Sequence, residues 1–206
     1  MTTDTPTIFV IDDQSSVRHA LGEMLSAFGY SVETFESADS FLRGLDPRRH
    51  GCIIADVRMP GMDGIELVRE LARRQTPLPV VVISGHADVP MAVAAIKAGA
   101  EDFIEKPIDD VQLVAAINRG LAGAVAQRRV HERIQDLRAR FDRLTPRERE
   151  VFDMVVEGYT SEAIGERLKI SIRTVEGYRV QIMNKMQAES VAVLVRQAIR
   201  LNRISA

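Results

Sequence analysis

The chain of 206 residues contains one cysteine and no tryptophan. A single cysteine, Cys52, excludes an internal disulfide and favours the reducing interior of a cell. No stretch approaches the roughly eighteen apolar residues of a membrane helix. Residues 1–7 also lack the basic and apolar regions of a signal peptide. We therefore expect a cytoplasmic protein without a membrane partner, in which Cys52 is a buried structural thiol.

The sequence has no strong excess of either charge, since its net charge is −2. This balance hides an asymmetry along the chain. Residues 1–123 carry 11 Lys or Arg against 18 Asp or Glu, whereas residues 124–143 carry six against three and residues 144–206 ten against eight. An acidic first part and a mildly basic remainder fit a regulatory domain joined to a nucleic-acid-binding domain. Two domains are also favoured by the length.

Apolar runs rich in β-branched residues alternate with helical patterns in the first half of the chain. Strands are predicted at 8–11, 32–35, 52–55, 80–83 and 103–105, and helices at 15–28, 37–45, 64–74, 89–98 and from about 109. Alternating strands and helices predict an α/β fold with a five-stranded parallel sheet, and an entirely apolar strand such as 80–83 fits a sheet covered on both faces. We expect the flavodoxin-like strand order 2-1-3-4-5.

Acidic, hydroxyl and basic residues lie at the ends of four of these strands. Asp12 and Asp13 follow the first strand, Asp56 the third, Ser84 the fourth and Lys106 the fifth. The carboxyl ends of the strands in an open α/β sheet line one crevice, so these side chains are expected to converge. Carboxylates, a hydroxyl and an ammonium suit a divalent cation and one phosphoryl group.

This order of residues, with Lys106 followed by Pro107, resembles the receiver domain of two-component response regulators over residues 7 to about 122. The stretch DVRMPGMDG at 56–64 strengthens the resemblance. It implies that Asp56 accepts a phosphoryl group, that Lys106 and Ser84 bind the phosphoryl oxygens, and that the Lys106–Pro107 peptide is cis. The implied ligands of a Mg²⁺ or Mn²⁺ ion are Asp12 through water, Asp13, Asp56 and the backbone carbonyl of Arg58.

The resemblance also implies how phosphorylation is transmitted. Ser84 and Phe103 would form a coupled switch, in which the hydroxyl moves to the phosphate and the ring turns inward; a plain core position for Phe103 is the alternative. The predicted helix 89–98 is apolar on most sides and so favours a second partner. We expect one stripe, at positions 89, 92, 93 and 96, to face the core. The other stripe is the predicted dimer face after phosphorylation: Met91, Ala94, Ala95 and Ala98.

Residues 123–143 show helical periodicity and no strand pattern. Ile134, Leu137, Phe141 and Leu144 recur at three- and four-residue spacing. We interpret this segment as a helical linker, into which the helix beginning near residue 109 can continue. Packing on its own chain and a coiled coil both remain open.

Residues 144–206 contain helical patterns only. A capping box over 145–148 starts the first helix, and Ser161 and Ser171 are expected to cap the second helix and the third, which spans 172–186. A fourth helix is expected over 190–201. This all-α, four-helix segment resembles the LuxR-type helix-turn-helix domain, through LTPREREV at 144–151 and SIRTVE at 171–176.

The resemblance makes helix 172–186 the recognition helix. Helical spacing predicts that Val175, Ile182 and Met186 are buried. The residues predicted to contact DNA are Arg173, Thr174, Glu176, Gly177, Arg179, Val180, Gln181 and Lys185. The cations and Thr174 suit phosphates, whereas Glu176 and Val180 suit base edges. Gly177 indicates a close backbone approach to DNA or a tolerated weakness of the helix.

The whole pattern resembles the NarL/FixJ family of response regulators. It predicts a receiver domain at 1–122, a helical linker at 123–143 and a DNA-binding domain at 144–206. A histidine kinase would phosphorylate Asp56, the receiver would dimerise, and the C-terminal domain would bind promoter DNA. RNA polymerase is left open as a further partner, and no enzymatic turnover of another molecule is expected.

Two alternatives come from other functional classes. One is a phosphatase of the haloacid dehalogenase type, which requires Asp-x-Asp where this chain has Asp12-Asp13. The other is a regulator of protein interactions whose C-terminal helices no longer bind DNA. A stable acyl phosphate on Asp56 would distinguish a response regulator from the phosphatase. A DNA-binding assay would distinguish it from the regulator of protein interactions.

Overall fold

The computed structural model describes residues 6–46, 49–86 and 88–204. The chain divides into two compact units, residues 1–128 and residues 129–206, and each is described by itself. The outermost residues of the predicted domains, 1–5 and 205–206, lie outside the described residues. Among the residues described, no helix combines the length and apolar character needed to cross a membrane.

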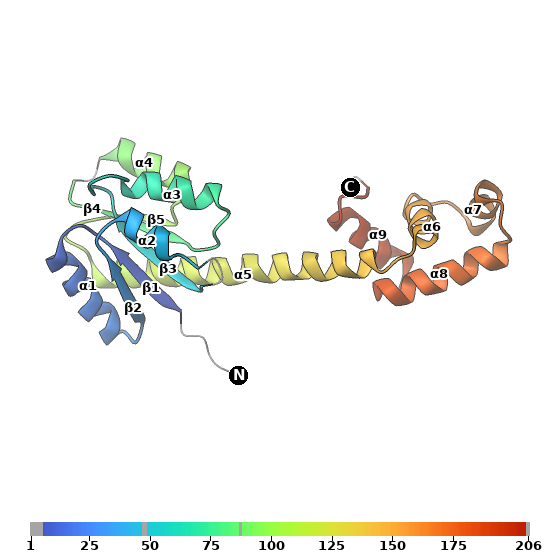
Figure 1. The fold of residues 1–206 in the computed structure, drawn as a ribbon, viewed down its shortest axis with the longest axis horizontal. Helices are drawn as coiled ribbons and strands as arrows, with labels where there is room; N and C mark the ends of the chain where they lie inside the picture. The colour runs from blue at the N-terminus through green and yellow to red at the C-terminus, as the bar shows by residue number, and fades with distance from the viewer. Residues whose placement is uncertain (1–5, 47–48, 87, 205–206) are drawn as a thin grey trace. The chain divides into compact units, whose positions relative to one another are not determined.

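The first unit is a parallel sheet between two helical layers (Figure 1). Its strands are β1 (Thr7–Ile11), β2 (Ser31–Phe35), β3 (Gly51–Asp56), β4 (Val80–Ser84) and β5 (Asp102–Glu105). They pair in the order β2-β1-β3-β4-β5, all parallel, as the sequence predicted. The helices of this unit are α1 (Ser15–Ala27), α2 (Ala38–Gly44), α3 (Gly64–Arg73), α4 (Val89–Ala98) and the first part of α5 (Asp110–Asp142).

Successive residues of each strand pack on opposite faces of the sheet. Phe9 and Ile53 pack with α2, α3 and α4 on one face, and Ile8 and Ile54 pack with α1 and α5 on the other (Figure 1). Burial of both faces explains why β3 and β4 are apolar throughout. Cys52 lies in the core beneath α1 and α5, and burial raises the pKa of its thiol to about 12. The predicted buried thiol is therefore confirmed.

The structure corrects the predicted faces of α4. Ala95 is fully buried, and Met91, Ala94 and Ala98 pack against the core on the α2–α4 side of the sheet. The predicted dimer face is therefore the core face, and that prediction was wrong. The larger residues of the other stripe, Val89, Val93 and Ile96, are 76%, 44% and 50% exposed.

The alanine stripe of α4 is the buried one because little space separates this helix from its neighbours. Alanines at positions 94, 95 and 98 let the backbone of α4 approach α3 and the sheet closely, whereas β-branched side chains there would need more room. The sequence interpretation assigned the bulkier stripe to the core, although bulk alone does not decide which stripe is buried.

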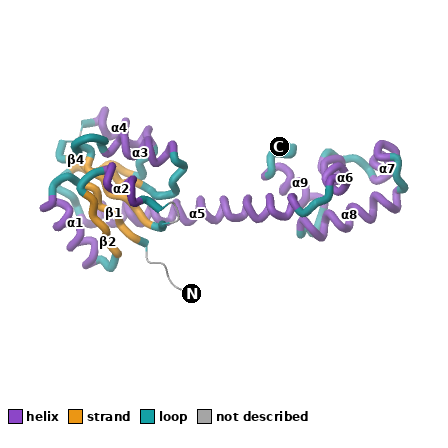
Figure 2. The backbone as a smooth tube through the Cα atoms, viewed as in Figure 1, coloured by secondary structure: helices purple, strands orange, loops and turns teal. Residues whose placement is uncertain are grey.

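Helix α5 is continuous from Asp110 to Asp142 and spans 33 residues (Figure 2). The predicted continuation of the helix through residues 123–142 is therefore confirmed. Near its start, Leu113, Ala116 and Ile117 are buried against the sheet. Near its end, Leu137 is buried in the core of the second unit, and Phe141 packs against that core. The burial of Leu137 supports packing on its own chain for this part of the helix.

Over its described residues, 129–204, the second unit contains helices and no strand. It contains the end of α5 together with α6 (Pro146–Val156), α7 (Ser161–Leu168), α8 (Ile172–Met186) and α9 (Val191–Arg200). The predicted capping box of Thr145 and Glu148 is present. Thr160, and not Ser161 as predicted, caps α7, because its side chain accepts a hydrogen bond from the backbone N–H of Ala163. Ser171 caps α8, as expected.

An ion pair between a buried carboxylate and a partly exposed lysine joins the start of α6 to the end of α8. Glu148 is only 5% exposed, and its Oε1 and Oε2 accept hydrogen bonds from Lys185 Nζ at 2.8 and 2.7 Å. Its Oε2 also accepts one from the backbone N–H of Thr145 at 2.7 Å. Burial by itself raises the pKa of Glu148, but the hydrogen bonds from Lys185 and Thr145 outweigh it and lower that pKa. The folded unit therefore favours the ionised carboxylate.

The substitution Glu148→Gln is expected to lower the free energy of unfolding at pH 7 by about 1–3 kcal/mol, because Lys185 loses its charged acceptor. The folded-state pKa of Glu148 lies below its ordinary value of 4.5. Its stabilisation is thus fully present above pH 4.5 and is lost as the pH falls through the folded-state value. Urea unfolding followed by circular dichroism, at pH 7 and at lower pH, measures both effects.

A matched control is Glu150→Gln, which removes an exposed ion pair with Arg147 on the same helix. It should change the free energy of unfolding by less than about 0.5 kcal/mol. Equal effects of the two substitutions at pH 7 would contradict the role assigned to Glu148.

Candidate functional site

The carboxyl ends of the strands bring together the residues that the sequence singled out. Asp12 follows β1, Asp56 ends β3, Ser84 ends β4 and Lys106 follows β5. Lys106 Nζ donates hydrogen bonds to Asp12 Oδ2 at 2.9 Å and to Asp56 Oδ1 at 2.6 Å. Asp12 is fully buried, and Asp56 is 5% exposed. Two carboxylates and one ammonium therefore meet at this edge of the sheet, and the Lys106–Pro107 peptide is cis, as expected.

Each of the two buried carboxylates is held at both oxygens. Besides Lys106, Asp56 accepts a hydrogen bond from the backbone N–H of Arg58 at 2.7 Å, and Asp12 accepts one from that of Gln14 at 2.9 Å. Burial lowers the pKa of Lys106, but the hydrogen bonds and charges of Asp56 and Asp12 outweigh it and raise that pKa above its ordinary value. Lys106 is thus kept as a cation that offsets the repulsion between the carboxylates.

Asp13 is placed differently from Asp12. It is exposed, and its backbone carbonyl accepts a hydrogen bond from Arg18 Nη1 at 3.0 Å, while the carbonyl of Asp12 accepts one from the same atom at 2.7 Å. The sequence analysis missed Arg18, although a cation in the first helical turns after an acidic pair is a signal that could have pointed to it. Arg18 fixes the backbone from which both aspartates extend.

The donors at this edge suit a hard divalent cation. Within the described part of the chain, no group of three or more His, Cys, Asp or Glu side chains is close enough to hold a metal as it stands. The side chains of Asp12 and Asp56 nevertheless carry two negative charges against the single ammonium of Lys106. Carboxylate oxygens are the ligands that Mg²⁺ prefers. The donor set therefore fits such an ion, as it does in receiver domains in general.

Ser84 is buried and bonded to the loop that follows β4. Its Oγ donates to the backbone carbonyl of His86 at 2.9 Å, accepts from the backbone N–H of His86 at 3.2 Å, and lies 3.7 Å from Met91 Sδ. Phe103, on β5, is half-buried and packs against the same core as Met91. Ser84 and Phe103 thus lie on neighbouring strands, with Phe103 paired to Val82, two residues before Ser84.

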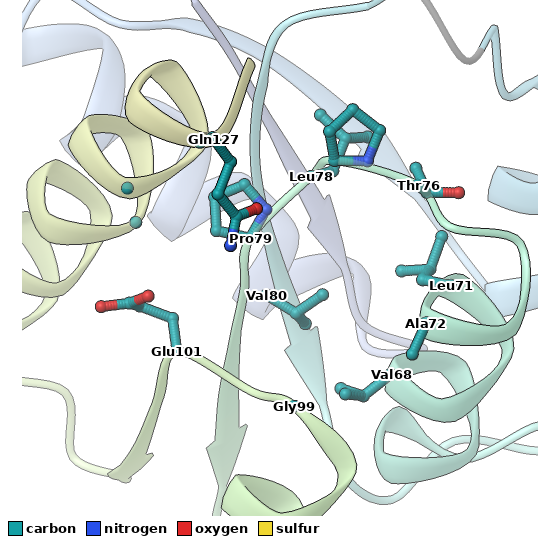
Figure 3. Close-up of a pocket in the computed structure, with 14 residues that line it drawn as sticks. Val68, Leu71, Ala72, Thr76, Leu78, Pro79, Val80, Gly99, Glu101 and Gln127 are labelled. Atoms are coloured by element: carbon teal, nitrogen blue, oxygen red, sulfur yellow. The ribbon is translucent and has the colours of Figure 1, made fainter. Parts of the chain in front are cut away.

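The first unit also contains a cavity of about 220 Å³ (Figure 3). It is lined from α3, the 76–80 segment and α5, and includes Val80 at the start of β4, whereas Ser84 ends that strand. Glu101 is the one charged residue in its lining. The two carboxylates that share an ammonium therefore lie in the cluster around Asp56 and not in this cavity.

The face of α8 predicted to meet DNA is open to solvent. Arg173, Thr174, Glu176, Gly177, Val180 and Gln181 are exposed, and Arg179 is half-buried. On the opposite side, Val175, Ile182 and Met186 are buried, as predicted. Lys185 was predicted to reach a phosphate, but its ammonium is bound to Glu148. The structure assigns it a packing role between α6 and α8, because a buried carboxylate needs a cation.

Close packing at the turn between α7 and α8 sets the position of the exposed face. Lys169 adopts a left-handed conformation (φ 53°), and a Cβ atom added at Gly165 would lie 2.9 Å from the backbone oxygen of Ile170. By contrast, a Cβ added at Gly177 would meet nothing within 4 Å. Packing inside the unit therefore does not require a glycine at position 177.

Comparison with known proteins finds one family for each part of the chain. Residues 8–118 match the family described as response regulator receiver domain, and residues 142–198 match the luxR family of bacterial regulatory proteins. The transcriptional regulatory protein FixJ of Bradyrhizobium diazoefficiens is 42% identical over 94% of this chain and 94% of its own length. The FixJ protein of Rhizobium meliloti is 44% identical over 94% of this chain and 95% of its own. The solved structure of the response regulator StyR has a TM-score of 0.84 and 40% identity, and the match covers 94% of this chain and 98% of that one.

The chain belongs to the NarL/FixJ family of response regulators. As a response regulator it combines a receiver domain with a LuxR-type DNA-binding domain. The relatives named above are regulatory proteins and not enzymes. The cluster of Asp12, Asp56 and Lys106 lies within the receiver match, and α8 lies within the LuxR-type match.

A substitution at Gly64 tests how the backbone positions Asp56 in this response regulator. A Cβ atom added at Gly64 would lie 2.3 Å from the backbone oxygen of Asp56. We expect Gly64→Ala to push the end of β3 away from Lys106, to lower the free energy of unfolding by about 1–3 kcal/mol, and to slow phosphorylation of Asp56 by acetyl phosphate. Urea unfolding and a rate measured by phosphate-affinity electrophoresis give the two readouts.

The matched control is Gly22→Ala on α1, where an added Cβ would meet nothing within 4 Å. It should stabilise the chain slightly through helix propensity and leave the rate unchanged. An unchanged rate in Gly64→Ala would contradict the positioning role.

Proposed function

We propose that this protein is a phosphorylation-dependent transcriptional regulator. A histidine kinase transfers a phosphoryl group to Asp56, the receiver domain dimerises, and the C-terminal domain binds promoter DNA in the cytoplasm. The observation that carries the proposal is the cluster in which Lys106 bonds both Asp56 and Asp12 at the edge of the receiver sheet. RNA polymerase is an additional partner to test at the promoter.

The chemistry at Asp56 is a transfer between two nucleophiles. The P–N bond of a phosphohistidine breaks, a P–O bond to an Asp56 carboxylate oxygen forms, and the histidine leaves with the electron pair of the broken bond. Lys106, already bonded to Asp56 Oδ1, stabilises negative charge on the transferred group. A Mg²⁺ or Mn²⁺ ion, held by Asp13, Asp56 and the Arg58 carbonyl and through water by Asp12, would supply further charge neutralisation.

Phosphorylation would change the hydrogen bonding of the Ser84 hydroxyl, which has a single proton to donate. In the structure this proton is donated to the carbonyl of His86. A hydroxyl has one proton to donate, so Ser84 cannot bond a phosphoryl oxygen and keep that bond. Phosphorylation would therefore release the loop at His86, and Phe103 would turn inward as Ser84 moves.

The exposed stripe of α4 supports a corrected dimer face. Val89, Val93 and Ile96 are large apolar residues open to solvent on one helix that follows the released loop. Exposed apolar surface of this kind marks interaction sites when it is contiguous. We place the dimer contact on these residues, in place of the buried alanine stripe.

Binding to DNA would use the exposed face of α8. Arg173, Thr174 and Arg179 are suited to phosphates, while Glu176, Val180 and Gln181 are suited to base edges. Gly177 leaves room for a close approach of the helix backbone to DNA. The net charge of residues 144–206 is only +2, so two copies on adjacent half-sites would be needed for tight binding.

Replacing the acceptor tests the function directly. We expect acetyl phosphate with Mg²⁺ to phosphorylate the wild-type chain and to strengthen its binding to its promoter in a gel shift, whereas Asp56→Asn should show neither effect. Asp63→Asn, a nearby carboxylate that caps α3, is the control and should respond as the wild type does. Turnover of added phosphomonoesters would indicate a phosphatase, and a promoter left unshifted with and without acetyl phosphate would indicate a regulator of protein interactions.

The dimer face has its own test. We expect Ile96→Lys to keep the phosphorylated chain monomeric at micromolar concentration in sedimentation, because the substitution places a charge in an apolar contact. Phe28→Lys replaces a similarly exposed apolar residue directly after α1 and should leave the phosphorylated dimer intact. Both variants should be phosphorylated at the wild-type rate. A wild-type chain that stays monomeric when phosphorylated would rule out the dimer.

A further inference from the structure

The carboxylate of Glu176 is bonded to a side chain of the neighbouring helix. Its Oε1 accepts a hydrogen bond from the hydroxyl of Ser161. Ser161 is the first residue of α7, whereas Glu176 lies in the second turn of α8. Glu176 is exposed, and Ser161 is half-buried. The tight turn at Gly165 and Ile170 brings the two helices close enough for this contact between residues 15 positions apart.

A carboxylate on a DNA-facing surface carries an electrostatic cost. Phosphates on both strands repel Glu176 as the helix enters a groove. The start of α7 offsets part of this cost, because the N-terminal end of a helix carries partial positive charge. The Ser161 hydroxyl adds a charge-assisted hydrogen bond at the same place. Glu176 is therefore held by Ser161 and not by a cation, which phosphates would attract.

The contact also restricts where the carboxylate points. A free glutamate side chain has several rotatable bonds, and ordering it on binding costs free energy. With Oε1 held by Ser161, the second oxygen of Glu176 is left for another donor. An ionised carboxylate accepts about four hydrogen bonds, so the hydroxyl does not saturate it. Among the base edges of the major groove, the amine of cytosine is a donor that glutamate can accept from.

We propose that Ser161 is a specificity-determining residue that positions Glu176 to read a cytosine at one base pair of the DNA site. This proposal rests on the DNA binding proposed above. Ser161 acts through Glu176 and does not itself read a base. Its loss should therefore change the preference at one base pair and leave the other positions unchanged.

The experiment selects sequences from a randomised double-stranded DNA library with the full-length chain, phosphorylated by acetyl phosphate. The proteins are the wild type, Ser161→Ala, Ser161→Thr, Glu176→Ala and the double variant with alanine at both positions. In Glu176→Ala we expect the cytosine preference at one base pair to disappear. In Ser161→Ala the same preference should fall by about 3- to 10-fold, the worth of one hydrogen bond. Ser161→Thr, which keeps the hydroxyl, should retain it.

The double variant separates positioning from a phosphate contact. If Ser161 acts through Glu176, the double variant should bind with the same preferences and affinity as Glu176→Ala alone. If Ser161 instead contacts a phosphate, its loss should weaken binding to every sequence about equally and should persist in the absence of Glu176.

Several results would overturn the proposal. They are a uniform loss of affinity in Ser161→Ala, a changed preference at a base pair other than the one altered by Glu176→Ala, or no change of preference in Glu176→Ala. If the wild-type chain enriches no sequence at all, the proposed DNA binding itself fails, and that outcome is distinguishable from the others. Circular dichroism of each variant checks that α7 and α8 remain folded.

Discussion

The receiver domain depends on the ammonium of Lys106, which is shared by two buried carboxylates. Asp12 follows β1 and Asp56 ends the adjacent strand β3, and the two carboxylates would repel each other in a site that water barely reaches. Lys106 comes from the far edge of the sheet and bonds both of them. The charge of this three-residue cluster is still negative, which suits the arrival of a divalent cation. The same ammonium is then in place for a transferred phosphoryl group.

Packing around the cluster connects the position of Asp56 to the helices α3 and α4. Gly64 lies against the backbone of Asp56, so α3 and the end of β3 are closely coupled. Ser84 is bonded to the loop at His86 and lies near Met91, so β4 and the first turn of α4 are coupled as well. Asp56 is paired in the sheet with Ile83, the residue before Ser84, so the end of β3, the end of β4 and the first turn of α4 follow one another in space.

The second unit also contains a buried carboxylate bonded to a lysine, and there the pair joins two helices. Glu148 is a buried carboxylate paired with Lys185, and the pair ties α6 to the end of α8. Charge that is buried in this way stabilises one arrangement of helices, because a carboxylate left without its cation would be costly. The exposed face of α8, which begins in the first turn after its cap at Ser171, is held in place by that packing.

The sequence by itself determined the strand order, the residues at the strand ends and the two domain types. These follow from local periodicity and from the rule that strand ends of a parallel sheet meet at one edge. The N-caps at Thr145 and Ser171 could also be predicted from the sequence, since capping depends on residues only three apart.

Only the tertiary structure decided which stripe of α4 is buried and what Lys185 binds. Both depend on distances between elements far apart in the chain. The alanine and valine stripes are both apolar, and the close approach of α3 favours the smaller side chains at Ala95. A lysine on a helix suits either a phosphate or a carboxylate, and the burial of Glu148 settles which one it meets here. Sequence patterns report what a side chain can do, whereas packing decides which neighbour it reaches.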